Sequence, residues 1–220
     1  MTRPTTEPLP ASPPPATAGP RGSDGRLAGL ALLAGCLVTA LGFLGVGFLV
    51  RAAGDARYTD PLWQPLYGVV LTGSVLVVLG LPAVLAAHGR TCRRLTLVGY
   101  VGLFAPLVML NVAETAMEAF VKPYLAGHGG VPAADPAGLT AFETVALALF
   151  LVGAVCLAVA VFRGRTAPRW VGVALLASLV TVFVLPHTGP AAFVSDYLIF
   201  AALFVFGLRA AVLRTVASAR

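Results

Sequence analysis

Oxygen-bearing side chains that could bind a cation recur along one apolar stretch of this sequence, at 95–121. Asn111, Glu114 and Glu118 follow one another at steps of three and four residues, which places them on one face of an α-helix. Carboxylate and amide oxygens coordinate hard cations, and carboxylates also bind protons. The spacing therefore predicts a polar or cation site. The alternative is a helix end that protrudes into water, where the same acids would be solvated.

Asp196 is a second candidate, in the last apolar stretch. It is predicted about six residues inside a helix that begins at Pro190, too far from the start to cap it. An acid within a membrane is costly and usually faces the bundle interior and a partner. We expect Asp196 to face inward, with Asn111 or Glu114 as its partner, since two adjacent carboxylates would favour a shared proton or a bound cation.

Glu143 and His187 complete the set of candidates, with weaker signals. Thr140 and Glu143 fit a capping box, S/T-x-x-E, directly before an apolar run, which favours a structural role for Glu143. His187 lies in a Pro-Gly turn, where a lone histidine is more often a turn residue than a ligand. Carboxylates and an imidazole could hold Zn²⁺ or Mn²⁺, which gives a metal alternative for Glu114, Glu118, Glu143, His187 and Asp196.

No sequence motif indicates a catalytic residue or a cofactor, so the cofactor stays unknown. The chain has no P-loop, no GxGxxG, no HExxH and no GxSxG. Ser195, Asp196 and His187 have the residue types of a hydrolase triad, but adjacent residues on a helix diverge by about 100°. We therefore do not expect a triad.

These candidate residues belong to a chain that is too apolar for a water-soluble fold. Of its 220 residues, 58% are hydrophobic and 11% charged, and the mean hydropathy is +0.90. A soluble domain is about one quarter charged. The composition predicts a multi-pass integral membrane protein with the lipid bilayer as its main partner. The net charge of +6 then reflects orientation in the bilayer, and nucleic acid is not an expected partner.

The fold class expected is all-α, a six-helix transmembrane bundle. About 20 apolar residues cross a bilayer as a helix, and six runs reach or approach that length: 27–50, 65–87, 95–121, 140–162, 168–185 and 190–208. Residues 1–26, rich in Pro, Ser, Thr and Ala, are predicted to form a disordered tail, and 214–220 a short basic tail. Pro82 and Pro106 lie inside runs and predict kinks.

The orientation follows from the basic residues. Twelve of the fifteen Lys and Arg residues lie in the N-terminal tail, in loops 88–94 and 163–169, and after the last run at 209–220, all on one side of the predicted membrane. The positive-inside rule places that side in the cytoplasm. Both termini are then cytoplasmic, most simply at the plasma (inner) membrane, and the candidate acids lie toward the outer side.

Two sequence patterns bear on assembly. Residues 89–94 and 164–169 share the pattern G-R-T-x-x-R, which fits either a duplicated hairpin or the small vocabulary of short loops. Gly35, Gly42, Gly45 and Gly47 in the first run fit a dimer face or, as we favour, close helix packing within the bundle. A homo- or hetero-oligomer in the membrane stays open.

Three classes of function remain. The short loops and missing catalytic motifs favour a non-catalytic binding, sensing or accessory membrane subunit. A transporter of a cation, proton or small solute that uses the outer carboxylates is the second class. An outer-leaflet enzyme, with or without a metal, is the third. Carboxylates that converge on a cavity would favour the transporter, whereas carboxylates that join His187 around a gap of metal size would favour the enzyme.

Overall fold

The computed structural model describes residues 22–50, 54–88, 92–132, 136–185 and 193–217, and these are helical with connecting turns and no strand. The first elements are α1 (Gly22–Leu49), the 3-10 helix η1 (Gly54–Thr59), α2 (Trp63–Gly80) and α3 (Pro82–His88). One long helix follows, here called helix three, built from α4 (Arg93–Pro106), the π-helical segments η2 (Leu107–Glu114) and η3 (Met117–Val121), and α5 (Lys122–Gly127). The last elements are α6 (Ala137–Gly164), α7 (Arg169–Val184) and α8 (Val194–Ala217).

Five of these helices are long and apolar enough to cross a membrane. They cover Gly25–Leu49, Trp63–Gly80, Arg93–Gly127, Ala137–Gly164 and Val194–Val212. The predicted all-helical fold is therefore confirmed, and the five apolar helices are consistent with a multi-pass membrane protein. The fifth predicted run, 168–185, corresponds to α7, a shorter apolar helix of 16 residues that is not among these five. Several ends differ from prediction: α1 begins at Gly22, within the predicted tail, α6 begins at Ala137, and α8 runs from Val194 to Ala217.

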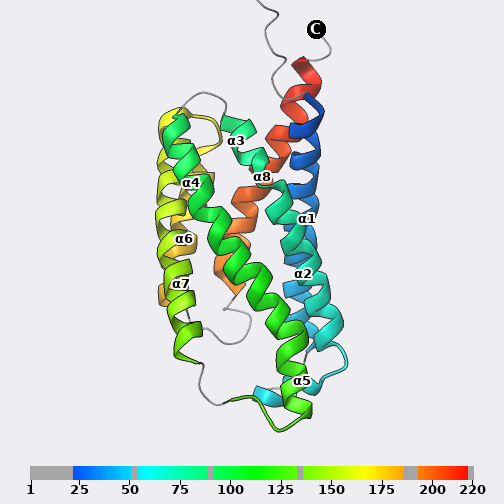
Figure 1. Ribbon diagram of the computed structural model, residues 1–220. Coiled ribbons are helices and arrows are strands. Elements are labelled where there is room, and N and C mark those ends of the chain that lie inside the picture. The colour runs from blue at the N-terminus through cyan, green and yellow to red at the C-terminus, as the bar shows by residue number, and fades with distance from the viewer. Residues whose placement is uncertain (1–21, 51–53, 89–91, 133–135, 186–192, 218–220) are drawn as a thin grey trace, which may run out of the picture.

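The helices form an elongated bundle with two distinct ends (Figure 1). The start of α1, the end of α8, α3 and the connection from α6 to α7 lie together at one end, here called the Arg-rich end. The short elements η1 and α5 lie at the other, here called the carboxylate end. Within the bundle, α1 contacts α2 and α8, while α4 contacts α6 and α7 lies between α6 and α8. Helix three runs obliquely and joins the two groups, because α4 packs on α6 and η3 packs on α2.

Glycines allow the closest helix contacts. A Cβ atom placed on Gly80 of α2 would lie 2.3 Å from the main-chain nitrogen of Leu32 in α1. A Cβ on Gly35 would lie 2.5 Å from the nitrogen of Val77, and one on Gly42 would meet Val70 at 2.6 Å. The helix-packing interpretation thus holds for Gly35 and Gly42, where an added side chain would clash, but not for Gly47, where an added Cβ would meet Phe193 at 3.9 Å.

The outer surface of the bundle is apolar on every long helix. Leu79 of α2 is 63% exposed and Val180 of α7 is 59% exposed, and similar side chains on α1, α4, α6 and α8 also face outward. A soluble protein rarely exposes contiguous apolar patches above a few hundred Å². Such a surface is suited to hydrocarbon rather than to water.

The two internal prolines interrupt their helices as predicted. The second run breaks at Leu81, so that Pro82 is the first residue of α3, where its missing N–H costs no hydrogen bond. Pro106 closes α4, and the helix continues with the wider π-type turns of η2. Removal of one main-chain donor at Pro106 fits this change of hydrogen bonding.

Candidate functional site

A cavity of about 1070 Å³ lies within the bundle toward the carboxylate end. Its walls come from α1, η1, α2, the π-helical part of helix three, α6, α7 and α8. Of the six residues singled out from the sequence, five line this cavity: Asn111, Glu114, Glu118, Glu143 and Asp196. The sixth, His187, lies outside the described residues.

Glu118 is the most deeply buried acid of the cavity. It is 8% exposed, and its Oε1 forms an ion pair with Lys122 one turn further along helix three. Its other oxygen, Oε2, is buried and has no hydrogen-bond partner in the described part of the chain. Glu118 therefore presents a half-satisfied carboxylate at the cavity wall.

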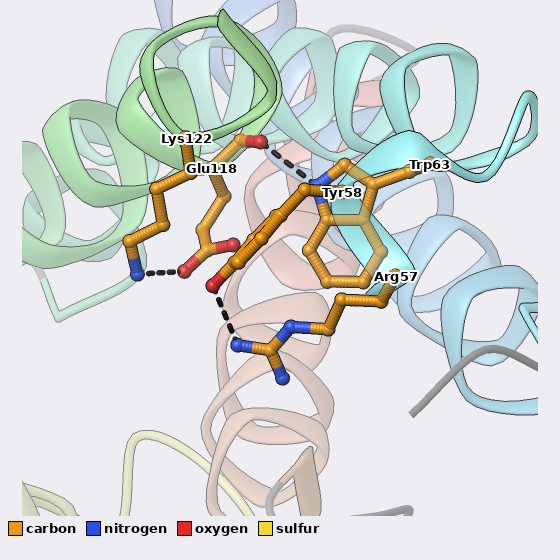
Figure 2. A network of polar contacts seen from close by, with 5 residues as sticks. All are labelled: Arg57, Tyr58, Trp63, Glu118 and Lys122. Carbon is orange, nitrogen blue, oxygen red and sulfur yellow. Dashed lines mark hydrogen bonds and ion pairs between the residues drawn. The ribbon is translucent and has the colours of Figure 1, made fainter. Parts of the chain in front are cut away.

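The main chain of Glu118 is held by α2. Trp63, at the start of α2, donates a hydrogen bond from its Nε1 to the carbonyl oxygen of Glu118, at 2.9 Å. Figure 2 shows Glu118 and Lys122 on helix three facing Tyr58, Trp63 and Arg57, which come from η1 and the start of α2. This bond ties helix three to α2 at the level of the cavity.

Arg57 supplies positive charge beside the acids. Its Nη2 donates to Oη of Tyr58 at 2.7 Å, and its guanidinium lies 4.8 Å from the ring centre of Tyr58 and 5.2 Å from that of Trp63. Burial lowers the pKa of Arg57, but the hydrogen bond to Tyr58 and the charge of Glu118 outweigh burial and raise that pKa above its ordinary value. Arg57 is therefore a permanent cation.

Asp196 and Glu114 line the cavity from two different helices, α8 and helix three. They are near enough for the charge of Glu114 to act on Asp196. Both partners predicted for Asp196, Glu114 and Asn111, line the same cavity as Asp196. The predicted depth of Asp196 in its helix was wrong: α8 begins at Val194, so Asp196 lies in the first turn, where free main-chain N–H groups favour a negative charge.

The capping role predicted for Glu143 is also wrong. Helix α6 begins at Ala137 with Pro136 as its N-cap, and no side chain caps it. Thr140 is therefore inside the helix, where its carbonyl accepts a hydrogen bond of 2.8 Å from Oγ1 of Thr144. Pro136 has an extended ψ of 141°, which starts the helix one turn earlier than the motif implied. Glu143 lines the cavity instead, and also a smaller hollow of about 90 Å³ that it shares with Glu114 and Lys122.

The acids surround the cavity rather than converge on one point. Among the described residues, no three His, Cys, Asp or Glu side chains lie close enough together to hold a metal ion. A structural or catalytic metal needs several ligands at about 2.0–2.6 Å. Ser195, for its part, donates its hydroxyl to the carbonyl of Ser178 at 2.9 Å. The described residues thus give the metal-assisted alternative no ligand set.

Several cavity residues were not anticipated from the sequence. Arg57, Trp63 and Tyr67 line it from η1 and α2. Aromatic residues next to an arginine at the start of an apolar run are typical of a membrane interface, and that pattern could have directed attention to them. Their contact with helix three could not be read from spacing.

Comparison with protein-family models, with curated proteins and with solved structures finds no match for this chain. The chain is therefore described by its own fold and cavity: among the described residues, five helices are apolar enough to cross a membrane, and several acids line one large cavity.

Proposed function

We propose that this protein is a transporter that binds a cationic solute in the cavity toward its carboxylate end. The observation that supports the proposal is that four carboxylates, those of Glu114, Glu118, Glu143 and Asp196, line one cavity although they come from three separate helices. Buried charges in a membrane protein are costly and mark solute or ion pathways. Arg57 and Lys122 balance only part of this negative charge.

The depth of the cavity favours transport over a purely superficial site. Its wall on helix three extends from Glu118 to Pro106, a distance of roughly 18 Å along a helix. The deep end thus reaches the middle of the 35-residue span Arg93–Gly127. The wall there is π-helical. Irregular helices near the middle of the membrane form the substrate sites of many transporters.

The proposal includes six crossings with both termini in the cytoplasm. Helix α7 supports the count, because it connects the end of α6 at the Arg-rich end to the start of α8. Twelve of fifteen basic residues support the orientation. The cavity then opens from the outer side. At the Arg-rich end the bundle is filled by fully buried side chains, among them Leu32, Leu203 and Phe206, which fits a conformation closed to the cytoplasm.

Concentration jumps on proteoliposomes test the proposal. The purified protein is reconstituted, and currents are recorded on a solid-supported membrane after addition of Na⁺, Mg²⁺ or organic ammonium ions at constant ionic strength. We expect at least one cation to give a current that Glu118→Gln and Asp196→Asn abolish. Asp55→Asn is the control, because Asp55 is exposed in η1 and does not line the cavity. Identical currents from protein-free vesicles would refute a cation site.

The same recording distinguishes a transporter from a second candidate function, that of a ligand-sensing or accessory subunit. The tightly filled Arg-rich end favours it, since a sensor needs no path to the cytoplasm. A sensor that binds the cation without moving it would give only a brief current with no accumulation inside the vesicles. A transporter would give accumulation that depends on the membrane potential.

A further inference from the structure

The chemical class of the solute follows from the walls of the cavity, and this inference rests on the proposed function. The negative charge of the cavity is the first observation. Glu118 is 8% exposed and its Oε2 has no hydrogen-bond partner among the described residues, although Oε1 is paired with Lys122. A buried carboxylate oxygen without a donor costs free energy. A ligand that carries an N–H or a positive charge would satisfy it.

The second observation is the aromatic character of the opposing walls. Phe43 of α1 and Phe193, just before α8, stack with their ring centres 4.7 Å apart. The ring centres of Tyr67 and Trp63 are 4.5 Å apart. All four rings line the cavity. Aromatic faces attract cations and bury apolar groups equally well. Arg57 already uses the face of Trp63 in this way.

The third observation is size. A volume of about 1070 Å³ is at the upper end of cavities that enclose drug-sized molecules, and far exceeds what a bare ion fills. The described residues include no group of three possible metal ligands at coordination distance. The cavity is therefore built for a molecule with a body as well as a charge.

We infer that the solute is an organic ammonium ion with an apolar, preferably aromatic, body. Its ammonium group pairs with the carboxylate of Glu118, whose buried Oε2 has no partner among the described residues, and Glu114 and Asp196 supply further negative charge. Its body lies against Phe43, Tyr67 and Phe193. Trp63 acts as a positioning residue, since its indole holds the main chain of Glu118.

Tryptophan fluorescence can report directly on this cavity. The chain has two tryptophans: Trp63 lines the cavity, and Trp170 is exposed at the start of α7, near the Arg-rich end. In the Trp170→Phe variant, purified in an uncharged detergent, Trp63 is the sole indole. Phenethylammonium and 2-phenylethanol form a matched pair of probes, because they share the aromatic body and differ in the charged group. Methylammonium supplies the charge without the ring.

We expect phenethylammonium to change the Trp63 emission saturably, and to bind about tenfold or more tightly than either 2-phenylethanol or methylammonium. Glu118→Gln in the same background should remove this preference for the charged probe. The substitution keeps the main-chain carbonyl that Trp63 contacts, so the reporter stays in place. Asp55→Asn should leave the preference unchanged. A thermal unfolding transition confirms that each variant is folded, and Asp196→Asn is a second cavity variant if Glu118→Gln does not fold.

Each other outcome overturns the inference in a distinguishable way. Equal affinity for phenethylammonium and 2-phenylethanol would show that the cavity recognises the apolar body alone. A response to Na⁺ or Mg²⁺ without one to phenethylammonium would leave the proposed cation function intact and refute the organic class. No response to any of these cations, together with no current in proteoliposomes, would refute both.

Discussion

Trp63 and Glu118, 55 positions apart in the sequence, are joined by a hydrogen bond from the indole nitrogen to the main-chain carbonyl. Trp63 is 3% exposed, and its ring meets Tyr58 edge-on at 5.3 Å. The bond fixes the π-helical part of helix three against α2, and thereby the direction in which the Glu118 carboxylate leaves the helix. A structural contact and the geometry of the cavity are therefore coupled at this point.

Trp63→Phe should weaken both the contact between helix three and α2 and the positioning of the Glu118 carboxylate. The substitution removes the N–H donor and leaves a buried carbonyl without it, which costs about 1–3 kcal/mol, while most of the aromatic packing stays. We expect a lower unfolding temperature in detergent and a weaker cation current. Trp170→Phe is the matched control and should change neither, because Trp170 is half exposed. A Trp63→Phe protein with unchanged stability and current would show that this bond does not position Glu118.

Two glycines of α2 test the packing against α1. At Gly80 an added Cβ would clash with the main chain of Leu32, whereas at Gly68 no atom lies within 4 Å of an added Cβ. Gly80→Ala should therefore destabilise the protein by about 1–3 kcal/mol through overpacking. Gly68→Ala should be neutral or stabilise by up to about 1 kcal/mol, since alanine is the better helix former. Thermal unfolding of the two variants checks the contrast, and equal effects would contradict the tight contact of α1 with α2.

His88 predicts a pH dependence of stability at the Arg-rich end. It ends α3, beyond the second span, where Nδ1 donates to the carbonyl of Val84 at 2.9 Å and Nε2 is buried without a partner in the described residues. Burial lowers the pKa of His88, and the charge of Arg209 lowers it further, against the hydrogen bond to Val84, which raises it.

The unfolded chain therefore binds a proton more readily than the folded one, and stability should fall as the pH drops below about 6.5. His88→Leu should flatten this part of the curve of unfolding temperature against pH. His128→Asn is the control, because His128 is exposed in the turn after α5. A variant at position 88 that keeps the full pH dependence would assign it to other groups.

The parts of this structure that follow from local sequence could be predicted. Long apolar runs located the long helices, although not all of their ends, and the steps of three and four placed Asn111, Glu114 and Glu118 on one wall. That wall is π-helical in the structure, yet all three residues still line the cavity. Pro82 and Pro106 marked the interruptions because proline removes a main-chain donor.

The features that depend on packing could not be predicted in the same way. Arg57 and Trp63 lie in and after a short 3-10 helix between two apolar runs, and their contact with helix three depends on how that helix crosses the bundle. The capping-box motif at Thr140 also gave a wrong helix start, because Pro136 is the N-cap of α6. A helix that starts at Pro190 would place Asp196 too deep. In the structure α8 begins at Val194.

Cysteine labelling tests the orientation in the membrane. After replacement of Cys36, Cys92 and Cys156, a single cysteine at His128 should react with an impermeant maleimide in intact cells. This exposed residue directly follows α5, and α5 lies at the carboxylate end. A single cysteine at Arg169 should react only after permeabilisation. The reason is the excess of basic residues that the sequence places on the predicted cytoplasmic side, where this substitution removes one of twelve. The reverse pattern would place the cavity on the cytoplasmic side.

Asp196 and Glu114 provide the closing test of the cavity. Both line it, and the charge of one acts on the other; two like charges in a cavity of low dielectric constant repel, and a bound cation relieves the repulsion. Asp196→Asn removes the repulsion at nearly constant volume, so the variant should fold with equal or greater stability. It should lose stabilisation by organic ammonium ions, measured as the shift in unfolding temperature on addition of phenethylammonium. Asp55→Asn, which changes the same charge outside the cavity, should keep that shift. If Asp196→Asn keeps it too, Asp196 takes no part in binding and its carboxylate serves the first turn of α8 alone.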